Sequence, residues 1–141
     1  MEALGMAGHV IRRLHQQSGA VFLTRAREAG YDLTSVQFAA MDAIRAHPGI
    51  DQAGVASLIA YDRATIGGVI DRLEGKGLIA RVVSPRDRRA RELRLTEDGT
   101  RAFEAFLPVV QDLQAEILAP LTPEERALFL RLARKAIGAP E

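Results

Sequence analysis

The stretch YDRATIGGVIDRLEGKGLIARVVSPRDRRARELRLT, which runs from residue 61 to residue 96, decides the fold. Its first half carries apolar side chains at positions i, i+3, i+4 and i+7 of a helix, namely Ile66, Val69, Ile70 and Leu73. From Leu78 onward the apolar period falls to two, which predicts strands over 79–83 and 91–95. The polar loop 84–90 joins these strands, so the stretch predicts a helix followed directly by a β-hairpin.

A shorter helix precedes this one. Asp51 is a suitable N-cap for a helix through Ile59, with apolar side chains expected to point inward at Val55, Leu58 and Ile59. Residues 60–62 form a three-residue break, after which the next helix is expected to start at once and to end at Gly75 and Gly77. Two short helices joined by a tight turn form a helix-turn-helix, and the hairpin after them is then a wing.

Further helices are expected before this unit. Apolar residues at helical spacing predict a helix over about 4–28, with Gly30 as its C-terminal cap. Thr34 and Gln37 form a capping box that starts another helix, which His47-Pro48-Gly49 stops.

Two more helices are expected after the hairpin. Thr96 can cap a long helix whose apolar residues step by three and four positions like a coiled-coil seam: Phe103, Phe106, Val110, Leu113 and Ile117. Pro108 lies inside this helix and should bend it. Thr122, followed by proline and with glutamate three positions on, starts a last helix to about Ile137. The sequence therefore predicts a mainly α-helical fold with a small β-hairpin.

Composition excludes several classes of protein. The 141 residues are 48% hydrophobic, enough for one domain with a core, but only 5% are aromatic, which argues against binding single-stranded nucleic acid by base stacking. The absence of cysteine excludes disulfides and thiolate metal sites. No apolar run approaches the roughly 20 residues that cross a bilayer, and the start of the chain lacks a signal-peptide pattern. We expect a cytoplasmic protein without membrane contact.

Arginine is concentrated in the hairpin, although the net charge of the whole chain is only +1. Six arginines fall between residues 81 and 94, and four of them crowd residues 86–91. Such a tip repels itself unless an anion is near, and both DNA phosphate and a narrow minor groove attract arginine. Charged hairpin tips are often only solvated, but a tip placed after a helix-turn-helix favours DNA contact. The candidate wing residues are Arg86, Asp87, Arg88, Arg89 and Arg91, with Asp87 expected to brace a neighbouring guanidinium.

The helix after the break is the candidate reader of duplex DNA in the major groove. With its apolar face inward, its outward face is expected to present Ala64, Thr65, Gly68 and Arg72, and Arg63 lies at its N-terminus. Gly67 and Gly68 each reduce helix propensity by about 1 kcal/mol. Their presence suggests a close backbone approach, either to DNA or to a neighbouring helix.

The terminal segments suggest a homodimer. Helices over about 4–29 and 96–138 supply more apolar surface than a DNA-binding lobe over about 34–95 needs, and a leftover apolar face usually marks an interface. The whole of 1–141 is expected to be one winged helix-turn-helix domain. A two-fold dimer places two reading helices about one DNA turn apart, which predicts a pseudo-palindromic operator.

Other kinds of site find less support in the sequence. His9 and Arg13 are four residues apart on one helix face and suit a ligand carboxylate, or they form an exposed polar edge of that helix. The six-residue spacing of His9 and His15 does not favour a metal site, and no cofactor is expected. Neither a nucleophile motif nor a phosphate loop indicates an enzyme. A winged-helix protein-interaction module without a small-molecule effector is the alternative, but such a module does not require the wing arginines.

Residues 61–79, together with the wing Arg86-Asp87-Arg88-Arg89 and the following Leu93-x-Leu95-Thr96, resemble the multiple-antibiotic-resistance regulator (MarR) family. The resemblance covers nearly the whole chain. It implies a triangular dimer joined by its N- and C-terminal helices, usually a repressor of transcription. It further implies relief by a small ligand between the dimer helices and the DNA-binding lobe, frequently a phenolic or aromatic carboxylate.

Within that family, residues 62–69 look most like regulators of aromatic-acid catabolism. Two departures matter. Ser84 stands where the wing often opens with aspartate, and Gly67 and Gly68 stand where many members carry a base-reading arginine or serine. The base specificity is therefore expected to depend more on Thr65, Arg63 and DNA shape than on bidentate side-chain contacts with bases.

Overall fold

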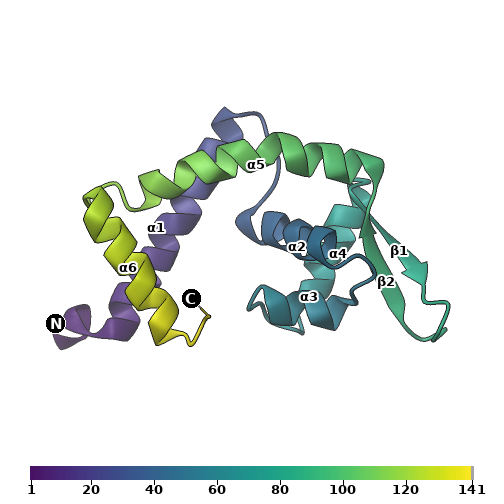
Figure 1. Cartoon of the computed structure of the whole chain (residues 1–141), viewed down its shortest axis with the longest axis horizontal. Helices are drawn as coiled ribbons and strands as arrows, with labels where there is room; N and C mark the ends of the chain where they lie inside the picture. The colour runs from purple at the N-terminus through teal and green to yellow at the C-terminus, as the bar shows by residue number, and fades with distance from the viewer. Residues whose placement is uncertain (141) are drawn as a thin grey trace.

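The computed structural model describes residues 1–140, so the last residue of the expected unit 1–141 lies outside the described residues. In Figure 1 the long helix α5 spans the top of an arch, α1 and α6 form one leg, and α2, α3 and α4 form the other. The hairpin extends from the second leg. In chain order the elements are a 3₁₀ turn at Glu2–Gly5, α1 (Ala7–Glu28), α2 (Ser35–Ala46), α3 (Gln52–Leu58), α4 (Ile66–Gly75), β1 (Ile79–Val83), β2 (Arg91–Leu95), α5 (Glu97–Ile117) and α6 (Pro123–Ala136).

This architecture is the winged helix-turn-helix with flanking helices that the sequence predicts. Both strands have the expected bounds. Among residues 1–140, no helix has the length and apolar character needed to cross a bilayer.

Local capping interactions set the ends of the helices as expected. The Thr34 hydroxyl accepts a hydrogen bond from the Gln37 amide at 3.1 Å, and the Gln37 side chain accepts one from the Thr34 amide at 3.1 Å. Thr122 and Glu125 form the same reciprocal pair at the start of α6, and the Thr96 hydroxyl caps α5 by accepting from the Gly99 amide. Gly77, with φ of +74°, ends α4 in the left-handed region that favours glycine.

The two-stranded sheet is hydrogen-bonded to the loop between α2 and α3. β1 and β2 pair antiparallel, with Ile79 opposite Leu95 and Arg81 opposite Leu93. The Gly49 amide donates to the Leu93 carbonyl and the Leu93 amide to the Ile50 carbonyl, both at 2.9 Å. These bonds hold the base of the hairpin on the lobe, whereas its tip projects beyond the helices (Figure 1).

The apolar stripe of α5 packs inside the chain. Phe103, Phe106, Val110 and Leu113 are buried, and α5 packs on both α1 and α2. Phe106 stacks on Tyr31 with ring centroids 4.5 Å apart, and Phe38 stacks on Phe103 at 4.9 Å. The coiled-coil-like stripe is therefore mostly core of the single chain rather than surplus surface.

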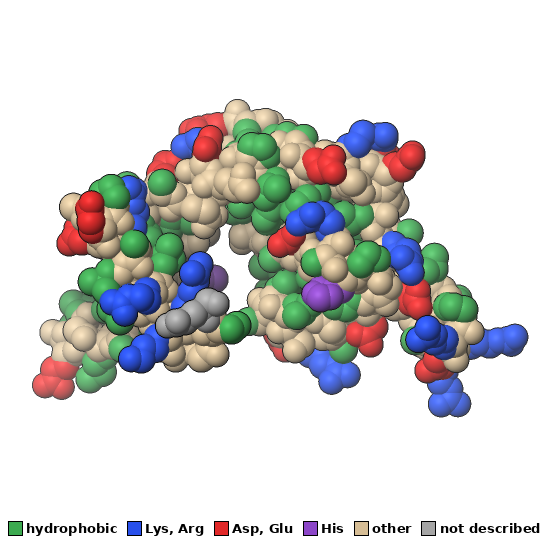
Figure 2. All heavy atoms as spheres, in the orientation of Figure 1, with side chains coloured by type: hydrophobic (Ala, Val, Ile, Leu, Met, Phe, Trp, Pro, Cys, Tyr) green, Lys and Arg blue, Asp and Glu red, His purple; other side chains and the backbone are tan. Residues whose placement is uncertain are grey.

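The surplus apolar surface lies instead at the two ends of the chain. No residue of α6 is buried, and Leu128 and Leu132 on its apolar face are 45% and 49% exposed. Val10 and Ile11 of α1 are 45% and 64% exposed. Figure 2 shows hydrophobic side chains gathered on this leg.

One side chain of the lobe that was predicted to point inward is exposed instead. Leu58 is 56% exposed, while Val55 on the same helix is fully buried. The reason is that α3 ends at Leu58 and the chain reverses at Ala60, whose φ is +53°.

Candidate nucleic-acid interface

The tip of the wing is a hydrogen-bonded turn with exposed arginines. The Ser84 hydroxyl, on a buried side chain, accepts from the amides of Arg86 at 3.2 Å and Asp87 at 3.4 Å. The Ser84 amide donates to the Ala90 carbonyl at 3.1 Å and closes the loop. Ser84, noted in the sequence only as a departure from the usual aspartate, therefore shapes the turn through the backbone.

Asp87 stabilises the wing differently from the prediction. Its Oδ1 accepts from the backbone amide of Arg89 at 3.0 Å and forms no ion pair with any arginine of residues 1–140. The expectation that it braces a guanidinium is wrong, because the aspartate is used by the turn itself. The side chains of Arg86, Arg88 and Arg89 are exposed and have no carboxylate partner in the described part of the chain. Figure 2 shows Lys or Arg side chains, in blue, extending from the tip of the hairpin.

The six hairpin arginines divide into two groups. Arg91 lies near the tip and donates to the Arg88 carbonyl at 3.0 Å, which orders the turn. Arg81 and Arg94 lie at the base and are paired with acids, Arg94 with Glu92 at 3.4 Å. The positive charge available to a partner is therefore concentrated at residues 86–91.

The reading helix begins later than predicted. α4 starts at Ile66, so Arg63, Ala64 and Thr65 lie in the turn before it rather than on its outward face. All three are exposed. The Asp62 side chain accepts from the Ala64 amide at 3.2 Å and from the Thr65 hydroxyl at 3.3 Å, which favours a turn over an earlier helical start.

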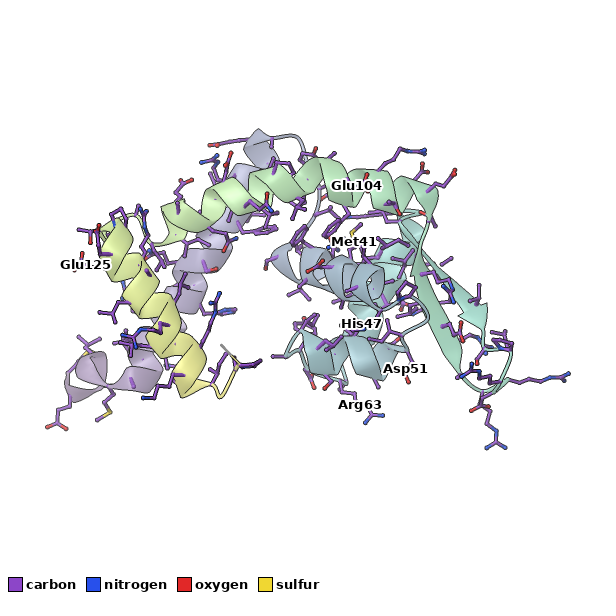
Figure 3. The ribbon with its side chains drawn as sticks, in the orientation of Figure 1. Met41, His47, Asp51, Arg63, Glu104 and Glu125 are labelled. Carbon is purple, nitrogen blue, oxygen red and sulfur yellow. The ribbon has the colours of Figure 1, made fainter. Side chains whose placement is uncertain are left out.

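These turn residues nevertheless stay at the edge of the lobe. Figure 3 shows Arg63 pointing away from the lobe, on the edge opposite α5. The hairpin tip projects toward the same edge (Figure 1).

The two glycines of α4 have different surroundings. A Cβ on Gly67 would lie 3.1 Å from Nε2 of Gln52, so this glycine makes room for a side chain of α3. Gly68 is exposed, and a Cβ there would meet only the Arg72 guanidinium, at 3.6 Å. Packing against a neighbouring helix explains Gly67, and the open surface at Gly68 leaves the helix backbone accessible.

His9 and Arg13 lie on α1, in the leg of the arch far from the hairpin. Arg13 is exposed, whereas His9 is half-buried and its Nε2 is buried without a hydrogen-bond partner among residues 1–140. Over the same residues, no group of three or more metal-ligating side chains is assembled.

Comparison with known proteins places these features in a family. The MarR family model matches residues 33–90, which include α2, the helix-turn-helix, β1 and the loop at the tip of the wing. The chain is 35% identical over 133 residues to the transcriptional regulator HosA of Escherichia coli, covering 94% of this chain and 96% of HosA. The chain belongs to the MarR family.

Other MarR-family proteins are similar over the same length. The transcriptional repressor NicR of Pseudomonas putida is 34% identical, with 95% of this chain and 84% of NicR covered. The structure of BpsR from Bordetella bronchiseptica, whose DNA binding is regulated by 6-hydroxynicotinic acid, matches with a TM-score of 0.86 at 31% identity. That match covers 97% of this chain and 96% of BpsR. The MarR-family chain described here is thus a winged-helix DNA-binding transcriptional regulator, and its relatives are regulators by name.

Proposed function

We propose that this protein is a homodimeric repressor without catalytic activity. A small aromatic carboxylate lowers its affinity for a pseudo-palindromic operator. The observation that carries the DNA part is that the hairpin tip and Arg63 both lie toward one edge of the lobe, and that Arg86, Arg88 and Arg89 at this tip are exposed without a carboxylate partner among residues 1–140. A surface of this kind suits two adjacent grooves of one duplex.

Within this proposal the wing and the reading helix have separate tasks. Arg88 and Arg89 enter the minor groove, and Arg86 and Arg91 lie along the flanking phosphates. The turn and helix enter the major groove, where exposed groups contact phosphate and base edges: Arg63, Ala64, Thr65, Gly68 and Arg72. Asp87 contributes by holding the backbone of the wing turn.

The homodimer is supported by the apolar surface at the two ends of the chain. α6 has no buried residue and keeps Leu128 and Leu132 half-exposed, although its N-terminus is fully capped. A capped amphipathic helix with an open apolar face is best stabilised by a second copy of the same surface. A two-fold dimer then presents two reading helices about 34 Å apart, one turn of DNA.

The effector is supported by the polar groups on α1. Burying the Nε2 of His9 without a partner is unfavourable by about 1–3 kcal/mol, which a ligand oxygen would relieve. Arg13 lies one turn further on the same helix face and suits a carboxylate. The DNA binding of BpsR is regulated by 6-hydroxynicotinic acid, an aromatic carboxylate whose ring also carries a hydroxyl group, so this compound is the first probe to use.

The DNA part is tested by fluorescence anisotropy with a labelled random duplex at several salt concentrations. Replacing Arg88 and Arg89 together by alanine should weaken binding and flatten the slope of log K against log salt by about one to two units per subunit. Arg101→Ala is the matched control, because Arg101 is an exposed arginine of α5 that pairs with Asp98. An unchanged slope in the double variant would place the wing away from DNA.

The effector part is tested by titrating 6-hydroxynicotinic acid and a panel of benzoates into the protein–duplex complex. Coupling between ligand and DNA sites is typically about 1–3 kcal/mol, so duplex affinity should fall by about 5- to 150-fold. His9→Ala and Arg13→Ala should remove the response, while the control His15→Ala, on the same helix, should retain it. If no aromatic acid changes the affinity, the proposed ligand class is wrong.

A further inference from the structure

Arg81 is the most constrained arginine of the hairpin. Its Nη2 lies 2.6 Å from Oδ1 of Asp71, and its Nη1 lies 2.9 Å from Oε1 of Glu74. Both carboxylates belong to α4, where a spacing of three residues puts them on one face. Only 24% of the Arg81 side chain is exposed, whereas Asp71 and Glu74 are more open to solvent. One guanidinium on β1 therefore joins the wing to the reading helix by two charge-assisted bonds.

A third element reaches the same guanidinium. Oε1 of Gln52, the first residue of α3, lies 3.5 Å from Nη2 of Arg81. The amide nitrogen of the same Gln52 side chain lies over Gly67, where a Cβ would be only 3.1 Å away. A glycine at this position of α4 thus leaves room for Gln52 to pass toward Arg81. The two helices of the helix-turn-helix and the first wing strand all meet at Arg81.

The surroundings of Arg81 argue against a phosphate contact. Both terminal nitrogens are already bonded to carboxylates, and the hydrogen bond that the guanidinium donates to Asp71 raises its pKa against the opposing effect of partial burial. Arg81 also lies at the base of the hairpin, opposite Leu93, rather than at the tip. It contrasts with Arg88 and Arg89, which have no carboxylate partner among residues 1–140.

The contacts of Arg81 fix the orientation of the hairpin relative to the lobe. A two-stranded hairpin is at best marginally stable alone, so its direction must be set by the lobe. The backbone bonds between Leu93 and residues 49–50 hold only the β2 side of the hairpin. The ion pairs of Arg81 attach the β1 side of the hairpin to α4. Fixing the wing before DNA arrives avoids the ordering of a loose segment on binding.

We propose that Arg81 is a positioning residue for DNA binding, which holds the wing at a set angle to the reading helix and does not itself touch DNA. This inference rests on the proposed interface of wing and helix. If a freed wing takes the bound orientation a tenth of the time, duplex affinity falls about tenfold.

The test compares Arg81→Met, which retains an unbranched apolar side chain, with Arg81→Lys and with the alanine double variant of Arg88 and Arg89. Duplex affinity is measured by anisotropy over a range of salt. Arg81→Met should bind about tenfold more weakly at every salt concentration, with a slope parallel to that of the wild type. The tip double variant should flatten the slope. Arg81→Lys should restore part of the affinity, because one ammonium can pair with one of the two acids but not bridge both.

Amide hydrogen exchange of the DNA-free protein supplies the second measurement. The amides of the hairpin should exchange faster in Arg81→Met, while those of the α5 core stay at the wild-type rate. A slope that falls by about one unit with unchanged hairpin exchange would make Arg81 a phosphate ligand and overturn the inference. Unchanged affinity together with unchanged exchange would also overturn it.

Failure of the proposed function has a different signature. In that case the wild type binds no duplex at low salt, and the anisotropy of all variants is equally flat. The exchange measurement on the free protein then still tests whether Arg81 holds the wing in place. Faster hairpin exchange in Arg81→Met supports this role, and exchange at the wild-type rate rejects it.

Discussion

Replacing Gly68 by alanine should stabilise the free protein and weaken its complex with DNA. Gly68 lies in the first turn of α4 and does not have a positive φ. A Cβ there would meet only Nη1 of Arg72, at 3.6 Å, an ordinary van der Waals distance. Alanine therefore fits the free structure and gains up to about 1 kcal/mol of helix propensity. For a chain of this length the melting temperature should rise by roughly 3–5 °C.

The effect on DNA binding has the opposite sign. If the helix backbone approaches DNA at Gly68, an added methyl group overpacks the interface by about 1–3 kcal/mol. The dissociation constant should then rise by about 5- to 150-fold. Melting is followed by calorimetry at a fixed protein concentration, and binding by anisotropy at a fixed salt concentration, since oligomerisation and salt would otherwise change both readings.

Gly67→Ala is the matched control. It makes the same chemical change one residue earlier in α4, but its Cβ would face Nε2 of Gln52 at 3.1 Å, on the side of α3. It should cost less DNA affinity than Gly68→Ala and stabilise the protein less, because Gln52 has to move. A Gly68→Ala variant that melts higher but binds DNA with wild-type affinity would refute the close approach of this helix to DNA. One that melts lower would refute the argument from propensity.

Three further predictions follow from the packing. Phe106→Ala should lower the free energy of unfolding by about 3–5 kcal/mol in urea titrations, since this buried ring lies within 4.5–5.7 Å of three other aromatic rings. Ser84→Ala removes the side-chain acceptor of two wing amides, so these amides should exchange faster with solvent and duplex affinity should fall, with the melting temperature changed by only a few degrees. The double variant Leu128→Asp and Leu132→Asp should sediment as a monomer where the wild type sediments as a dimer, while its DNA-binding lobe stays folded by circular dichroism. A wild type that is monomeric at micromolar concentration would contradict the last prediction.

The arch separates two parts of the molecule with different tasks in the proposed mechanism. The wing and reading helix form one end, and the half-buried His9 of α1 lies in the opposite leg. α5 packs on both α1 and α2 and connects the two ends. The ion pair of Arg25 with Glu116, at 2.5 Å, fastens α1 to the far half of α5. Within one subunit, a ligand bound at α1 would act on the lobe by changing how α1, α2 and α5 pack.

Local signals in the sequence were enough to predict the elements of the fold. The capping boxes of α2 and α6, the cap of α5 at Thr96 and the turn glycine Gly77 act within about four residues of the chain. Each therefore stays readable without the tertiary structure. The change of apolar period at Leu78 located both strands of the wing for the same reason. The start of α4 was misplaced because the Asp62 side chain competes for the backbone of the turn.

Long-range pairing is what the sequence by itself left open. The apolar stripe of α5 has the same spacing whether it packs inside the chain or on a second copy, and only the fold assigns it to the core around Phe106. The density of arginine in the hairpin was visible in the sequence, but the partner of each guanidinium was not. Arg81 and Arg88 are the same residue type, but Arg81 lies beside Asp71 and Glu74, whereas Arg88 has no carboxylate partner among residues 1–140. The sequence determined where charge and helices lie along the chain, and the tertiary structure decided which charges are neutralised, because neutralisation depends on distance in space.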